Sequence, residues 1–358
     1  MDAALANLVE QVRVAAAARQ ALRIRGGGSK DFYGNPCAGE PLDTRALRGI
    51  VAYEPSELVV TARAGTPLAE LESTLAAAGP MLAFEPPHFG AAATVGGCVA
   101  AGLAGPRRAS AGTSWGALRD FVLGTRLLDG RAQLLAFGGT VMKNVAGYDL
   151  SRVLAGSLGI LGVIVEVSLK VLPRPAAEAT LRFAMDERQA LRELNAWGGR
   201  PLPLSASAWH DGTLQLRLSG ARAAVDAAHL QLGGELAATD VAAAFWTDVR
   251  EQRLSFFAGA APLWRLSLPS VAPPLELEGP QLIEWGGALR WLRTQLPAAA
   301  VRARAAELGG HATLFRGADR TAATFTPLAP PLAAIHQRLK AEFDPAGIFN
   351  RGRMYAEY

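Results

Sequence analysis

The sequence predicts an α+β protein with two folded units and a C-terminal tail. The chain has 358 residues, of which 50% are hydrophobic and 19% charged, so it has enough apolar material for more than one core. Helix and strand signals alternate over residues 1–175. The pattern changes after Pro175, so we place a second α+β unit at 176–296 and the tail at 297–358.

The first unit begins with an amphipathic helix over residues 1–20, followed by a short strand at Ala21–Ile24 that leads into three glycines. Strands are predicted near Gly49–Tyr53 and over Glu57–Gly65. The residues that follow these strands predict where the next helix lies.

A marked helix follows the second of these strands, with Thr66 expected as its N-cap, Pro67 as its first residue and Gly79 as its end. Further along, the dipeptide Asp129-Gly130 predicts a hairpin between two strands. The β-branched run "GVIVEVSLKV" then predicts a buried strand, which ends at the prolines of "LPRP".

The second unit is predicted as an antiparallel sheet with helices on one face. Ala-rich helices are expected after the first and third strands, and Ser270–Pro280 is expected as a surface loop. The predicted strands are Thr180–Ala184, Leu204–Trp209, Leu214–Leu218, Leu263–Leu268 and Gln281–Trp285.

Composition argues against several classes of function. The net charge of +4 comes from scattered arginines without interleaved aromatic residues, which argues against nucleic-acid binding. Cys37 and Cys98 are too few for a disulfide framework or a metal cage. No apolar run approaches the ~18 residues that a membrane-spanning helix needs. We therefore expect a cytoplasmic protein without a metal.

A first glycine stretch is a candidate for binding an anionic ligand. Arg25 ends a predicted strand, and residues 26–29 are Gly-Gly-Gly-Ser. Successive amides in such a turn form an anion-binding nest, and glycine lets the anion approach the backbone closely. The stretch matches neither the Rossmann nor the Walker pattern, so a tight loop remains the alternative.

Two further glycine stretches strengthen this interpretation. Thr94–Gly97 opens a small-residue helix, whose N-terminus favours negative charge. Gly156, Gly159 and Gly162 precede the predicted buried strand and would let backbone lie against a flat ring. Each stretch also has an alternative interpretation without a ligand: a packing helix for the first and a glycine-rich turn before a core strand for the second. Two separate glycine loops in one unit nevertheless fit a long diphosphate ligand better than either loop does.

Several motifs occur together in one order: "RGGGSK", "TVGGCVAAGLAGP", "RDFVLG", "GYDL" and "GSLGILGVIVE". Together they resemble the FAD-binding domain of the vanillyl-alcohol oxidase / p-cresol methylhydroxylase (PCMH) superfamily over residues 1–175. The stretches "GLAGPRR", "GGTVMKNVAGYDLSR" and "EWGGALRW" are similar to the E-subunit family of bacterial glycolate oxidase. The closing "FDPAGIFNRGRM" resembles the superfamily's C-terminal segment, which folds back toward the flavin domain.

The resemblance implies a PCMH-type domain of two subdomains that holds FAD, followed by a smaller α+β cap domain that faces the flavin ring. FAD is expected to be non-covalent, because Gly28 stands where some relatives carry a flavin-linked histidine. The cofactor-binding residues that it implies are Arg25, Gly26, Gly27, Gly28, Ser29, Pro87, Thr94, Gly96, Gly97, Gly105, Gly156, Gly159, Gly162 and Ile164.

Catalytic residues are not singled out by the sequence. Arg265, Arg290 and Arg316 are candidates for binding a substrate carboxylate, but nothing in the second half identifies a base. Larger relatives carry a histidine-rich metal and substrate motif that is reduced here to "GGHATLFRG", with His311 alone, so no metal is expected. His88 is either a flavin-loop residue or a turn histidine. "EWGGALRW" is either an interface hot spot or a core turn.

The resemblance implies an FAD-binding subunit of a glycolate (2-hydroxy-acid) dehydrogenase complex with a reduced substrate pocket. Its partners would be a D-type FAD subunit and an iron–sulfur F-type subunit, through which the complex could attach to the inner membrane. Two alternatives stay open: a self-sufficient FAD-dependent oxidase of a small hydroxy acid, and a non-catalytic structural FAD-binding subunit.

Overall fold

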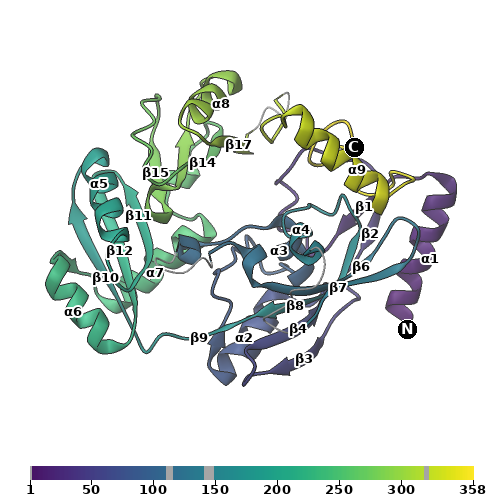
Figure 1. Cartoon of the computed structure of the whole chain (residues 1–358), viewed down its shortest axis with the longest axis horizontal. Coiled ribbons are helices and arrows are strands. Elements are labelled where there is room, and N and C mark those ends of the chain that lie inside the picture. The colour runs from purple at the N-terminus through teal and green to yellow at the C-terminus, as the bar shows by residue number, and fades with distance from the viewer. Residues whose placement is uncertain (1, 110–115, 141–148, 318–321) are drawn as a thin grey trace.

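The computed structural model describes residues 2–109, 116–140, 149–317 and 322–358, which form two lobes (Figure 1). One lobe contains a five-stranded antiparallel sheet and the other an eight-stranded antiparallel sheet. The chain crosses into the second lobe before β10 (Ala177–Ala184) and returns to the first with α9 (Pro330–Phe343). The first lobe is therefore completed by the end of the chain.

The five-stranded sheet has the order β3-β4-β8-β6-β7. Its central strand is buried almost throughout, as the β-branched run predicts. Helices α2 and α3 pack against one core cluster, and α1 packs against another with β1 and β2. The strands of this sheet are β3 (Ile50–Glu54), β4 (Val59–Arg63), β6 (Val122–Leu128), β7 (Leu134–Gly138) and β8 (Val163–Lys170). Two small sheets accompany it, one of β1 (Leu22–Arg25) and β2 (Glu40–Asp43), the other of β5 (Pro80–Met81) and β9 (Leu172–Pro173). The helices are α1 (Ala3–Ala18), α2 (Leu68–Ala78), α3 (Val95–Ala101) and the short α4 (Leu150–Val153).

The start of α2 differs from the predicted cap. The helix begins at Leu68, and Pro67 precedes it without a side-chain cap. Thr66 Oγ1 instead bonds the backbone of Gly49, donating to its carbonyl at 3.1 Å and accepting from its N–H at 3.0 Å. Thr66 therefore connects the start of α2 to the residue that precedes β3. Gly79 ends α2 with φ 99°, as predicted.

The hairpin of β6 and β7 is confirmed, although its loop is longer than the dipeptide suggested. Residues 129–133 separate the two strands. Asp129 is buried and accepts from the N–H groups of Arg131 at 2.9 Å and Gln133 at 2.8 Å. Asp129 thus stabilises this loop through its side chain as well as its backbone.

The eight-stranded sheet has the order β13-β10-β12-β11-β15-β16-β14-β17. All four predicted strands from residue 204 to 284 are present, together with β10, and β16 is an addition that the sequence did not predict. The further strands are β11 (Leu204–His210), β12 (Thr213–Gly220), β13 (Glu235–Leu236), β14 (Leu263–Ser267), β15 (Gln281–Glu284), β16 (Leu289–Arg293) and β17 (His311–Arg316).

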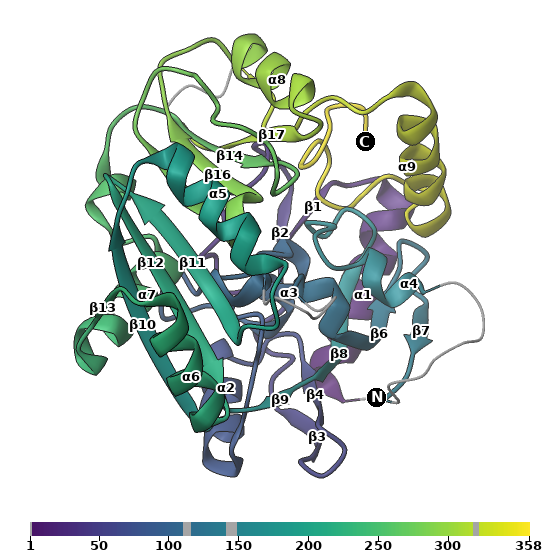
Figure 2. The same ribbon diagram turned by 60° about the vertical axis from the view of Figure 1, so that its left-hand side comes forward.

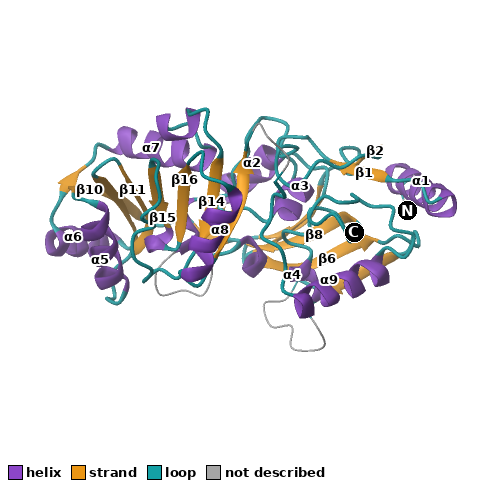
Figure 3. Cartoon of the chain, turned by 90° about the horizontal axis from the view of Figure 1, so that it is seen from above, coloured by secondary structure: helices purple, strands orange, loops and turns teal. Residues whose placement is uncertain are grey.

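Helices cover both faces of this sheet, whereas the sequence analysis placed them on one (Figures 2 and 3). Leu181 packs in a cluster with α5 (Glu187–Gly198) and α6 (Arg222–Leu232). The preceding residue, Thr180, accepts a 2.9 Å hydrogen bond from Trp246 of α7. Helix α7 spans Thr239–Glu251. Successive strand side chains point to opposite faces, so Thr180 and Leu181 are buried on opposite sides of β10.

Residues 297–316, expected in the tail, lie in the second lobe. Helix α8 (Ala298–Glu307) leads into β17, which pairs antiparallel with β14. The six residues "HATLFR" give too short an apolar alternation to be recognised as a strand. We propose that the second unit extends to residue 316 and that the segment beginning with α9 is the part that returns to the first lobe.

Charged side chains connect the two lobes. Glu85, which precedes α3, accepts from Arg217 Nη2 at 2.8 Å and from the Arg107 N–H at 3.1 Å. Arg107 Nη2 donates to Glu178 at 2.5 Å. Burial alone would raise the pKa of Glu85, but the two arginines outweigh it and lower the pKa. Glu85 therefore stays ionised and holds both lobes in one arrangement.

A buried ion pair anchors the C-terminal segment to the first lobe. Lys340 Nζ donates to the Asp344 carboxylate at 2.6 Å and to the carbonyls of Ile160 and Phe349 at 2.7 and 2.8 Å. Asp344 in turn accepts from the N–H groups of Ile348 and Phe349. A buried pair is tolerated when its remaining hydrogen bonds are made, as they are here. The contact joins the loop before β8 to residues 348–349.

Replacing Asp344 by alanine is expected to destabilise the protein by about 3–5 kcal/mol, because Lys340 would stay buried without a counter-charge. Urea unfolding of the purified chain measures this change. Glu10→Ala, which removes a solvent-exposed pair with Arg13, is the control and should leave unfolding unchanged. Similar unfolding midpoints for D344A and E10A would contradict the assigned role of the buried pair.

Candidate FAD site: a glycine cradle and a cavity between the lobes

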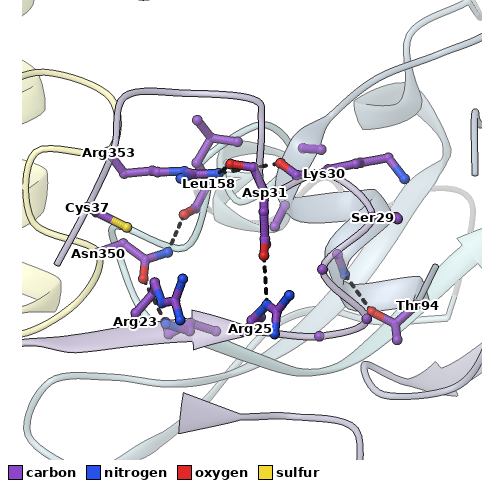
Figure 4. Close-up of a pocket in the computed structure, with 17 residues that line it drawn as sticks. Arg23, Arg25, Ser29, Lys30, Asp31, Cys37, Thr94, Leu158, Asn350 and Arg353 are labelled. Atoms are coloured by element: carbon purple, nitrogen blue, oxygen red, sulfur yellow. Dashed lines mark hydrogen bonds and ion pairs between the residues drawn. The ribbon is translucent and has the colours of Figure 1, made fainter. Parts of the chain in front are cut away.

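The first two glycine stretches lie against each other in the structure (Figure 4). Strand β1 delivers residues 26–29 beside Thr94, the N-cap of α3, whose Oγ1 accepts from Gly97 N at 3.3 Å. A Cβ on Gly26 would lie 2.4 Å from Thr94 Oγ1, and a Cβ on Gly27 would lie 1.4 Å from the Ala92 carbonyl oxygen. The two loops can meet only because these residues lack side chains.

The backbone amides of residues 26–29 are unpaired. Within the described part of the chain, no acceptor bonds the N–H groups of Gly26, Gly27, Gly28 or Ser29. They border a cavity of about 120 Å³, and Gly28 adopts φ 74°, a left-handed turn. Unpaired successive amides in such a turn form a nest for an anion. We call these residues, together with Thr94 and Gly97, the cradle.

Cations outnumber acids around the cradle. Arg23, Arg25, Lys30 and Arg353 line its cavity together with one acid, Asp31. Arg25 Nε donates to Asp31 at 2.7 Å, so one positive charge is compensated. The net charge of the lining is positive, which suits a phosphate ligand.

Lys30 has a structural role besides its charge. Its Nζ donates to the His88 carbonyl at 3.2 Å and lies 5.6 Å from the centre of the Phe89 ring. Burial lowers the pKa of Lys30. Lys30 therefore links the glycine loop to the loop that precedes α3.

Sequence reasoning missed Asn350, which organises the cradle from the far end of the chain. Its Oδ1 accepts from Ile24 N at 2.8 Å and its Nδ2 donates to the Leu158 carbonyl at 2.6 Å. Asn350 is buried and adopts φ 41°. The motif "FNRGRM" was the signal for it, although a motif does not show which of its side chains reaches the site.

Four predicted residues pack against protein instead. A Cβ on Gly96 would lie 2.5 Å from Ala64 Cβ, and one on Gly162 would lie 2.7 Å from the Leu128 carbonyl oxygen. A Cβ on Gly159 would lie 2.7 Å from Asn350 Nδ2. Ile164 is buried in the core of the first lobe. Close packing thus accounts for glycine at positions 96, 159 and 162, and Ile164 is a core residue.

A second cavity, of about 780 Å³, lies between the two lobes. Gly156 lines it from the first lobe, and Arg265, Trp285 and His311 line it from the second. Ala101, at the end of α3, borders both this cavity and the cradle. The two spaces therefore adjoin, as an elongated ligand would require.

Pro87 and Gly105 border a smaller space of about 20 Å³ next to this cavity. Glu284 and Arg265 border it as well, from the second lobe. The Gly105 carbonyl accepts a 3.0 Å hydrogen bond from Trp285 Nε1. Pro87 and Gly105 thus belong to the contact between the lobes rather than to the cradle.

Of the three candidate arginines, only Arg265 lines the cavity between the lobes. Arg290 is fully buried, and its guanidinium donates to the carbonyls of residues 272, 273 and 287. Arg316 lies 4.5 Å from the centre of the Phe32 ring. Arg290 therefore supports the backbone of the second lobe, and Arg316 packs on an aromatic ring.

The turn interpretation of His88 is supported. His88 Nε2 lies 2.9 Å from Glu72, and Glu251 of α7 accepts from the N–H groups of His88 and Phe89. The loop before α3 is thereby fixed to the second lobe.

The stretch "EWGGALRW" covers the end of β15, a turn at residues 285–288 and the start of β16. Trp285 and Trp291 are buried, with 4% and 5% of their surface exposed. This favours the core-turn interpretation over an interface. The other family motif, "GGTVMKNVAGYDLSR", spans residues 138–152, of which 141–148 lie outside the described residues.

Residues 4–138 match the family "FAD binding domain". The chain is 51% identical to glycolate oxidase subunit GlcE of Escherichia coli (strain K12), over 98% of this chain and 97% of that protein. The chain belongs to the GlcE family of glycolate oxidase subunits. The expected family, PCMH-type fold and FAD cofactor are thereby confirmed.

Other similarities to this member of the GlcE family are more distant. Glycolate oxidase subunit GlcD of Bacillus subtilis (strain 168) is 36% identical over 88 residues, which cover 25% of this chain and 18% of that protein. A solved structure of alkyldihydroxyacetonephosphate synthase superimposes with a TM-score of 0.67 at 15% identity, over 96% of this chain and 73% of that one. The latter shows a shared fold.

A metal-binding cluster and a membrane-spanning helix are both absent from the described residues. Among residues 2–109, 116–140, 149–317 and 322–358, no group of three or more His, Cys, Asp or Glu side chains is placed to hold a metal ion. No helix in that part of the chain combines the length and apolar character needed to cross a bilayer.

Glu284 is an unusually basic carboxylate beside the cavity. Burial raises its pKa to about 7, although Trp291 Nε1 donates to it at 2.7 Å and Arg265 carries a positive charge nearby. The folded state thus favours the protonated form. Its stabilising contribution is present below about pH 4.5, the ordinary pKa, and is lost as pH rises through about 7.

Wild type is therefore expected to lose stability relative to Glu284→Gln, by up to about 3 kcal/mol, as pH rises from about 5 to about 8. Glutamine keeps the shape and an acceptor for Trp291 but does not ionise. Unfolding of both proteins across this pH range measures the difference. Parallel stability curves would show that Glu284 does not titrate with a raised pKa.

Proposed function

We propose that this protein is the FAD-bearing subunit of a glycolate oxidase complex that oxidises glycolate to glyoxylate. The observation that supports this most strongly is the similarity to GlcE over nearly the whole of both chains. The unpaired amides of the cradle and its surrounding cations provide the matching physical feature. Activity on glycolate would thus be shared with partner subunits.

The cradle fits the diphosphate of FAD. The amides of residues 26–29 would donate to its oxygens, while the positive N-terminal end of α3 and the nearby arginines would balance its charge. The cavity that adjoins at Ala101 would receive the ring system, with Gly156 along its wall. When bound, FAD supplies the hydride acceptor, and the chain positions it and excludes water.

Partner subunits are part of this proposal. The similarity to GlcD concerns a subunit that carries the name of the same oxidase. With two cysteines, this chain lacks the four thiolates that an iron–sulfur cluster uses, so we propose that electrons leave through an F-type iron–sulfur subunit. Attachment to the inner membrane would then occur through these partners, and the chain itself would be cytoplasmic.

Gly27→Ala is expected to abolish retention of FAD, because the new Cβ would force the Ala92 carbonyl and the cradle apart. The flavin-to-protein ratio after native purification measures retention. Gly198→Ala is the control, since a Cβ there meets no atom within 4 Å. If G27A lowers the thermal midpoint, Gly28→Val serves as a second variant at a positive φ. Stoichiometric FAD in both cradle variants would contradict the assignment.

Purification of the tagged chain from its own cells is expected to recover a D-type flavoprotein and a protein with four-cysteine clusters. Glycolate should bleach the flavin absorbance of this assembly. Bleaching of the isolated chain at the same rate would instead favour the self-sufficient oxidase, for which Arg265 in the cavity is the specific argument. An assembly whose flavin on this chain never responds to glycolate would favour the structural subunit.

A further inference from the structure

The sheet of the second lobe places polar side chains toward the first lobe at three aligned positions. Arg265 on β14 pairs with Trp291 on β16 and with Thr313 on β17. Paired residues of neighbouring strands share one face, and so do residues two apart along a strand. Ser267 and His311, which are themselves paired, therefore join this face. All of these except Trp291 line the 780 Å³ cavity.

Arg265 forms no direct ion pair with any described residue. Among the described residues, no carboxylate lies within 4.0 Å of its guanidinium, and no hydrogen bond to it is formed. Its guanidinium carbon lies 5.2 Å from the Trp285 ring centre and 6.0 Å from that of Trp291. The two indoles hold the group in place and leave its N–H donors free. Glu284, which interacts electrostatically with Arg265, accepts its hydrogen bond from Trp291 instead.

A polar hydroxyl lies beside this cation. Tyr33 is buried with 8% of its surface exposed, lines the same cavity, and interacts electrostatically with Arg265. No described residue forms a hydrogen bond with the Tyr33 hydroxyl. Both groups line the cavity, so an anion bound there would accept hydrogen bonds from the guanidinium and from the hydroxyl.

We propose that Arg265 and Tyr33 form a binding site for a small carboxylate within this chain, in the cavity between the lobes that adjoins the cradle. A guanidinium that lies over two indole rings can present a pair of N–H donors, which matches the two oxygens of a carboxylate. The proposal rests on the proposed function, because FAD would occupy the neighbouring space. It replaces the expectation of a reduced substrate pocket with a complete anion site of this subunit.

The test uses the full chain purified with its FAD, and oxalate, a small dicarboxylate that is not a hydroxy acid, as the probe. Calorimetry and the flavin difference spectrum measure binding. Wild type should bind oxalate and should ignore ethylene glycol, which has the same carbon count and no charge. Arg265→Met should weaken oxalate binding about tenfold or more, because methionine fills the space beside the two indoles but carries no charge. The variant should still retain FAD.

Arg182→Met is the matched control, because Arg182 lies on β10 of the same sheet and its partner, Glu235, lies 3.6 Å away at the surface. R182M should bind oxalate as wild type does. If R265M does not fold, Arg265→Lys serves as the second variant, because it keeps the positive charge but loses the paired N–H donors of the guanidinium. An oxalate affinity lower by about threefold or more would then support the site. Equal affinity in R265K would contradict it.

Three results would overturn the inference. FAD-loaded wild type could fail to bind oxalate, R265M could bind it as tightly as wild type, or R265M could lose FAD. The last result would assign Arg265 to the cofactor. A chain without FAD would refute the proposed function instead, and calorimetry on that chain would still report whether oxalate binds. The two failures are therefore distinguishable.

Discussion

Contact between two backbone loops is the constraint on which the rest of this structure depends. Gly27 meets the Ala92 carbonyl so closely that even a methyl group would not fit, and Gly26 meets Thr94 in the same way. Among the described residues, this contact leaves a row of amides without a protein acceptor. Successive unpaired amides in such a turn form a nest that suits an anion. The cradle is therefore the part of the structure that we propose binds the diphosphate of FAD.

The remaining architecture keeps this contact in place. Asn350 bonds both Ile24 and Leu158, so the end of the chain fixes the strand that delivers the glycines. Glu85 and Glu251 join the loop before α3 to the second lobe from two sides. As a result, the cavity between the lobes is enclosed by residues from three distant parts of the sequence.

Local signals were sufficient where local geometry decides. The sequence predicted the glycine loops, the small-residue helix that opens at Thr94–Gly97 and the end of α2 at Gly79, because each depends on a few adjacent residues. It failed where tertiary contacts decide. Thr66 bonds Gly49 rather than capping α2, and β17 becomes a strand only by pairing with β14. Arg265 was one of three equivalent arginines until the sheet register showed which one faces the cavity.

The most direct measurement is a crystal structure of the chain grown with FAD. The account predicts that diphosphate oxygens lie within hydrogen-bonding distance of the amides of residues 26–29, next to Thr94, with the ring system beyond Ala101. A structure in which the diphosphate lies elsewhere, and in which these amides bond water or other protein groups, would contradict the account at its central point.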